Sequence, residues 1–206
     1  LFHLSNAQVL APDFTVVDTD GNSHNLYDYC EDGKIVVLDF FYVGCSYCEY
    51  YSVHIQQSYE DFGCNNGDVV FLAIDWNDTD AEVQTFDSTY SLTYPSASGL
   101  EGGGDSVVSL YNISYFTTLL VIGPNKQILK NIKPPTTNNI DSFLLVLGAQ
   151  MTPCNVSIEE EVKESNVQLI QNPIQQDAKI FLHVTKSANY QICISDLSGK
   201  VVYQNE

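Results

Sequence analysis

Two cysteines stand directly behind a long apolar run. The run is Ile35-Val-Val-Leu-Asp-Phe-Phe-Tyr-Val43, and the cysteines follow as Cys45-Ser-Tyr-Cys48. The run predicts a buried strand, and the pattern over residues 46–62 predicts a helix immediately after it. Cys45 would then lie exposed at the helix N-terminus, where free backbone N–H groups and the helix dipole stabilise a thiolate. Cys48 would lie one turn further on, close enough to attack a mixed disulfide. The arrangement suits disulfide exchange.

The cysteine pair also fits two other interpretations, half of a zinc site and a purely structural disulfide. Zinc needs two more ligands at a compatible spacing. The sequence has no second CxxC and no HxxxH, and its four histidines are scattered. We therefore predict no metal site and no cofactor, whereas the structural disulfide remains an alternative.

The flanking residues extend the pattern. Residues 11–21 (Ala-Pro-Asp-Phe-Thr-Val-Val-Asp-Thr-Asp-Gly) and residues 111–126 resemble two segments of the thioredoxin-like redoxins. These segments are the opening hairpin and the stretch that passes the active site into a strand and hairpin. The thioredoxin-like redoxins include secreted thiol–disulfide oxidoreductases and peroxiredoxins. The resemblance covers roughly residues 9–150 and implies a thioredoxin-like α/β fold with an N-terminal β-hairpin. It implies that Cys45 attacks and Cys48 resolves.

Three further site residues follow from this resemblance. Asp39 matches the buried carboxylate that thioredoxins place beneath the second cysteine, where a raised pKa lets it relay a proton. The alternative is a strand-edge carboxylate that faces water. Phe116 and Thr117 are expected to bind substrate, because Thr117 aligns with the family's cis-proline. A cis bond before a non-proline residue costs about 3 kcal/mol, so we expect the Phe116–Thr117 peptide to be trans.

Composition excludes several functions. The formal net charge is −18, from 26 acidic residues against eight basic ones, all of them lysines. This charge argues against nucleic acid or an anionic membrane as partner, and no stretch is apolar enough to span a membrane. Peroxiredoxins need a threonine where Tyr42 stands, and an arginine. Copper-delivery relatives use CxxxC with a distant histidine. Peroxidase activity and copper delivery are therefore disfavoured.

The chain is predicted to have four parts. Residues 1–8 look like the remnant of a signal peptide or a disordered N-terminus. Residues 9–152 form the thioredoxin-like domain, 153–165 a linker, and 166–206 a small antiparallel β-sandwich that looks truncated. Residues 172–202, with Asp196-Leu-Ser-Gly-Lys-Val-Val202, resemble the sorting domain of type IX secretion cargo. That resemblance implies the type IX machinery as a partner. A generic adhesion sandwich is the alternative.

The expected elements alternate strand and helix up to residue 150 and are short strands thereafter. Strands are expected at 13–19, 35–43, 69–74, 118–122, 127–132, 167–171, 178–185, 190–195 and 201–204, and helices at 23–29, 46–62, 79–90, 106–111 and 139–150.

Four cysteines remain besides the CxxC pair, which suggests an oxidising compartment. Cys30 precedes the strand that leads up to the active site, and Cys64 follows the helix that runs back from it. Both should lie at the end of the domain away from Cys45, so we predict a structural Cys30–Cys64 disulfide. The pairing of Cys154 and Cys193 stays open, and four buried thiols are the alternative.

Together these features predict a secreted or cell-surface thiol–disulfide oxidoreductase, exported through the periplasm of a Gram-negative bacterium. It would exchange disulfides with protein substrates through Cys45 and Cys48. The rival is a non-catalytic surface protein that keeps the thioredoxin scaffold for binding. Two features would suit it: the loss of the family's cis-proline, and the tyrosines around the cysteine pair, Tyr42, Tyr47, Tyr50 and Tyr51. Turnover of a small disulfide separates the two.

Overall fold

The computed structural model describes residues 9–154, 167–169, 180–182, 193–195 and 201–204. Contacts divide the chain into two units, residues 1–155 and 156–206. The predicted signal-peptide remnant lies outside the described residues, as does nearly all of the predicted linker. The exact domain boundaries stay predictions.

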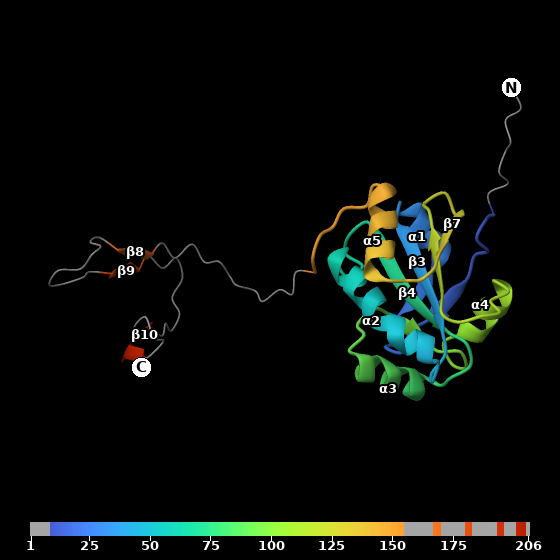
Figure 1. The fold of residues 1–206 in the computed structure, drawn as a ribbon, viewed down its shortest axis with the longest axis horizontal. Coiled ribbons are helices and arrows are strands. Elements are labelled where there is room, and N and C mark those ends of the chain that lie inside the picture. The colour runs from blue at the N-terminus through green and yellow to red at the C-terminus, as the bar shows by residue number, and fades with distance from the viewer. Residues whose placement is uncertain (1–8, 155–166, 170–179, 183–192, 196–200, 205–206) are drawn as a thin grey trace, which may run out of the picture. The chain divides into compact units, whose positions relative to one another are not determined.

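A five-stranded mixed sheet forms the centre of the first unit (Figure 1). Its order is β5-β4-β3-β6-β7, in which β3 is parallel to β4 and antiparallel to β6. Every residue of β3 and β4 is buried, because both faces of the sheet are covered, and this explains their continuous apolar runs. The strands are β3 Ile35–Phe41, β4 Val69–Asp75, β5 Ser96–Ala97, β6 Thr118–Ile122 and β7 Ile128–Ile132.

Helices cover both faces of this sheet. One face packs against α2, α3 and α5, and the other against α1, α4 and a small hairpin of β1 and β2. The side chains of β3 alternate between the two layers: Val37 and Phe41 point into the first, and Val36 and Phe40 into the second. The bounds are β1 Thr15–Val17, β2 Ser23–Asn25, α1 Leu26–Glu31, α2 Ser46–Asp61, α3 Asp80–Tyr90, α4 Gly104–Leu110 and α5 Thr137–Val146.

The segment 23–29 differs from the sequence prediction of a helix. Its first half is strand β2, which pairs with β1, and α1 begins only at Leu26. Asn25 caps the helix, because its side-chain oxygen accepts the backbone N–H of Asp28 at 2.9 Å. The pairing with β1 is a tertiary contact that the local pattern did not contain.

The described residues of the second unit form four short strands, each inside a predicted strand segment. They form two antiparallel pairs, β8 with β9 and β10 with β11. The sandwich and the sorting domain themselves stay predictions. The strands are β8 Val167–Leu169, β9 Ile180–Leu182, β10 Cys193–Ser195 and β11 Val201–Gln204. Among the residues that can be placed, no helix is long and apolar enough to cross a membrane.

The predicted Cys30–Cys64 disulfide is wrong. Cys64 is bonded to Cys154, with Cα atoms 5.5 Å apart, and Cys30 is a buried free thiol. Cys30 lies on α1 and packs in one core layer, whereas Cys64 packs against the other layer. The prediction placed both cysteines at one end of the domain, but the sheet separates them.

Cys154 reaches Cys64 because the chain after α5 runs back along the end of α2. The backbone N–H of Thr152 donates to the carbonyl of Asp61 at 2.9 Å, and that of Cys154 donates to the carbonyl of Glu60 at 2.9 Å. The disulfide therefore fastens the segment after the last helix of the domain to the end of α2.

Candidate active site

The cysteine pair lies at the start of α2, as the sequence predicts. Cys45 is the N-cap residue, and the two cysteines form a disulfide with Cα atoms 5.2 Å apart. In this disulfide form Cys45 is buried, with 4% of its surface exposed, so the expectation of an exposed Cys45 is wrong for the oxidised protein. The Cys45 Sγ accepts the backbone N–H of Cys48 at 3.2 Å. Gly44 precedes the pair with φ +85°, a conformation that favours glycine. A thiolate released at Cys45 would meet both this N–H and the positive end of the helix dipole.

Asp39 is buried in the middle of β3, with 4% of its surface exposed. It lies between Val37 and Phe41 on the strand, and so faces the core layer that holds Cys48. The alternative of a strand-edge carboxylate facing water is therefore wrong, because β3 is the central strand of the sheet.

Two hydroxyl groups bind the Asp39 carboxylate from opposite sides of β3. Thr117, just before β6, donates to Oδ1 at 2.8 Å, and Tyr94, just before β5, donates to Oδ2 at 3.2 Å. Burial raises the pKa of Asp39 to about 6, although both hydrogen bonds lower it. Asp39 can therefore take up or release a proton close to neutral pH.

The Phe116–Thr117 peptide is cis, so the expectation of a trans bond was wrong. That expectation weighed only the local backbone preference. The tertiary contacts of Thr117 decide here: its hydroxyl binds Asp39, and the next residue starts β6, which pairs with β3.

An aromatic cleft lies beside the cysteine loop. Trp76 stacks on Phe116 with ring centroids 5.7 Å apart, and Tyr42 packs edge-on against both. The cleft has a volume of about 860 Å³, and Trp76 is 45% exposed. The sequence interpretation included Phe116 and missed Trp76, although Trp76 directly follows β4. The carboxyl ends of parallel strands are common positions for site residues.

A pair of aspartates, buried Asp75 and partly exposed Asp78, holds the loop before Cys45 and was also missed. Asp78 accepts the backbone N–H of Val43 at 2.7 Å, while Asp75 accepts the N–H groups of Asp78 at 2.7 Å and Gly99 at 2.9 Å. Burial raises the pKa of Asp75 to about 7. These bonds fix the end of β4 to the loop that carries the cysteines.

The geometry agrees with comparisons to known proteins. Residues 8–130 match the sequence profile of the AhpC/TSA family. The chain belongs to this family. A thiol-disulfide oxidoreductase ResA from Bacillus thuringiensis is 28% identical to this AhpC/TSA chain over 135 residues, 65% of this chain and 74% of the relative.

Solved structures show the same fold. The thioredoxin domain of a thiol-disulfide oxidoreductase from Bacteroides vulgatus superposes with a TM-score of 0.57 and 21% identity, over 68% of this chain and 99% of that one. A secreted disulfide oxidoreductase of Mycobacterium tuberculosis gives a TM-score of 0.53 and 18% identity, over 65% and 95%. The thioredoxin-like α/β fold predicted for the first unit is thus confirmed. The ResA relatives confirm the predicted enzyme class within the AhpC/TSA family, thiol–disulfide oxidoreductase.

Proposed function

We propose that this protein is an exported oxidoreductase that exchanges disulfides with cysteine-containing proteins. The observation that carries the proposal is the position of Cys45. Its sulfur caps α2 and accepts the N–H of Cys48, while a buried carboxylate lies on the strand that leads to the pair. A thiol in this environment is held as a nucleophilic thiolate.

The exchange proceeds in two steps. The reduced Cys45 thiolate attacks a substrate disulfide, forms a mixed disulfide and releases one substrate thiolate. Cys48, once deprotonated, then attacks the Cys45 sulfur, which forms the Cys45–Cys48 disulfide and releases the second substrate thiol. The same two steps in reverse oxidise a substrate dithiol, so the site supports electron flow in either direction.

Asp39 is assigned as the proton acceptor for Cys48. The Cys48 thiol must lose its proton before it attacks, and an ordinary thiol with a pKa of about 8.5 is mostly protonated at neutral pH. Asp39 is ionised above a pKa of about 6 and faces the layer that contains Cys48. It can therefore accept the proton where the thiol alone would rarely release it.

Phe116 and Thr117 are proposed to contact the substrate. Phe116 lines the aromatic cleft together with Tyr42, whose carbonyl accepts the backbone N–H of Cys45 at 3.3 Å. An extended segment of the substrate that carries the reacting cysteine could pack its apolar side chains against these aromatic rings. Protein substrates, rather than small thiols alone, would use this surface.

Export is proposed from the cysteines and from the second unit. A structural disulfide such as Cys64–Cys154 persists in oxidising compartments. The resemblance of residues 172–202 to type IX cargo would supply the route, with that machinery as partner. Fractionation of the native cells tests this proposal: the protein should be in the periplasm or outside the cell, and a cytoplasmic location contradicts it.

The role of Asp39 makes a kinetic prediction. Asp39→Asn should slow resolution of the mixed disulfide by about tenfold or more near pH 7 while leaving the first attack by Cys45 largely intact. In the wild type the resolution rate should fall as pH decreases through about 6, because Asp39 becomes protonated. Above about pH 8.5 the variant should approach the wild type, since Cys48 then ionises unaided.

Rapid mixing with a fluorescent peptide disulfide separates the two steps. Asp141→Asn is a matched control, because burial also raises the pKa of this partly buried α5 carboxyl. Equal slowing of both steps by Asp39→Asn would show that Asp39 acts on the fold or on Cys45 instead.

A further inference from the structure

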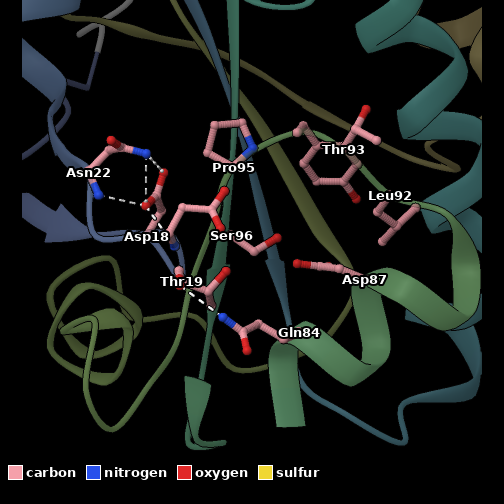
Figure 2. Close-up of a pocket in the computed structure, with 11 residues that line it drawn as sticks. Asp18, Thr19, Asn22, Gln84, Asp87, Leu92, Thr93, Pro95 and Ser96 are labelled. Carbon is pink, nitrogen blue, oxygen red and sulfur yellow. Dashed lines mark hydrogen bonds between the residues drawn. The ribbon is translucent and has the colours of Figure 1, made fainter. Parts of the chain in front are cut away.

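A second pocket lies at the β5 edge of the sheet. It has a volume of about 290 Å³ and lies between the β1–β2 turn, α3 and β5 (Figure 2). The Gln84 amide closes one side by donating to the Thr19 carbonyl at 2.9 Å. The side chains of Asp87 and Ser96 point toward one another in this pocket.

Two polar atoms in the pocket are left without partners. The Asp87 Oδ1 and the Ser96 Oγ are buried, and neither has a hydrogen-bond partner within the described part of the chain. The Ser96 residue is only 2% exposed. Buried polar atoms are almost always hydrogen-bonded, often to water. A pocket of this size holds several waters, at about 30 Å³ each. Both atoms are therefore placed to bind water.

This pocket is connected to Asp39. In the sheet, Asp39 pairs with Ala73 and Ala73 pairs with Ser96, so the three side chains lie in one row on one face. The middle residue contributes only a methyl group. Tyr94 lines the pocket, and its hydroxyl donates to the Asp39 Oδ2. The bond from Thr117 approaches from the opposite side, where substrate is proposed to bind.

We propose that this pocket is the port through which Asp39 exchanges its proton with solvent, using the Tyr94 hydroxyl and waters held by Ser96 and Asp87. The inference rests on the proposed function, in which Asp39 receives the proton of Cys48. Protonated Asp39 donates to the Tyr94 oxygen while Tyr94 passes its own proton to a pocket water. The phenol stays neutral, and the water passes the proton to Asp87, which releases it to bulk solvent. The proton can then leave while substrate covers the cysteines.

The electrostatics of the pocket suit a proton acceptor. Burial, together with the charges of Asp39 on β3 and Asp20 in the β1–β2 turn, raises the pKa of Asp87 to about 7, although the nearby Ser96 hydroxyl lowers it. Asp18 of the same turn is already engaged by His24 at 2.8 Å. Asp87 can thus hold a proton near neutral pH and release it to solvent.

Carboxyl ¹³C NMR of the oxidised protein tests the port. The exchange rate of the Asp39 proton is measured at the titration midpoint of each variant, because Tyr94→Phe also removes a hydrogen bond that lowers the pKa of Asp39. We expect Tyr94→Phe and Asp87→Asn each to slow this exchange by about tenfold or more. Ser96→Val, which replaces the hydroxyl with methyl groups inside the pocket, should also slow the exchange of the Asp39 proton. It provides a third test if one of the other two variants fails to fold.

Two variants serve as controls. Tyr59→Phe removes a hydroxyl from a buried ring that packs on Tyr94 with centroids 5.9 Å apart, and Asp141→Asn removes a carboxyl elsewhere. Both should exchange like the wild type. Unchanged exchange in Asp87→Asn or in Tyr94→Phe overturns the port. Failure of the proposed function would give a different result. Asp39→Asn would then leave the titration of the Cys48 thiol unchanged, whatever exchange rate the Asp39 proton shows in the wild type.

Discussion

Replacing Cys45 with serine is expected to abolish disulfide turnover, by roughly 10³-fold or more. A serine hydroxyl is not ionised at neutral pH, so the helix N-terminus then has no nucleophile to stabilise. Cys48→Ser should behave differently, because Cys45 can still attack. That variant should accumulate a stable mixed disulfide at Cys45, seen by mass spectrometry as one substrate molecule bound per protein. Turnover of a small fluorescent disulfide measures both effects.

Cys30→Ser is the matched control for this pair. Cys30 is also a buried cysteine, but it lies in the core layer on the other face of the sheet. Its replacement should leave turnover close to the wild-type value as long as the variant is folded. If the wild type were no faster than Cys45→Ser, the non-catalytic binding protein would become the better account, with the aromatic cleft as its binding surface.

Replacing Cys154 with serine should destabilise the first unit strongly. The Cys64–Cys154 bond joins residues 90 apart in sequence. In the chain-entropy model a loop of that length contributes about 4–5 kcal/mol, mainly by restricting the unfolded chain. Denaturant unfolding without reductant measures the loss. The fluorescence of Trp76, the single tryptophan of the chain, reports on this unit alone.

Cys64→Ser supplies the control for that experiment. It should cause a similar loss, and the double variant should lose no more than either single variant, because both changes break one bond. Additive losses would mean that each cysteine contributes separately through packing. A midpoint unchanged by Cys154→Ser would contradict the disulfide.

The sequence predicted the parts of the site that depend on local pattern. The apolar run 35–43 and the cysteines that follow it indicated a strand, a helix N-terminus and a thiol pair, and the structure has all three. Asp39 could be placed because it belongs to that strand. These features depend on neighbouring residues in the chain, where hydrophobic periodicity and capping act directly.

Features that depend on long-range packing were missed or mistaken. Cys64 pairs with Cys154 rather than Cys30, because the segment after α5 returns along α2 while the sheet separates α1 from it. Tyr94 contacts Asp39 across 55 positions of sequence, and no local signal marks it. The cis Phe116–Thr117 peptide was also mistaken for a trans one, because its contacts across the sheet outweigh the local backbone preference for trans.

Limited alkylation of the reduced protein tests the central claim most directly. Iodoacetamide below one equivalent, followed by peptide mapping across a pH series, reports which thiol is the nucleophile. Cys45 should be labelled first, with a reactivity midpoint below the ordinary thiol value of about 8.5, because it caps α2 and accepts the N–H of Cys48. Preferential labelling of Cys48, or a Cys45 midpoint at or above the ordinary value, would contradict the assignment of roles.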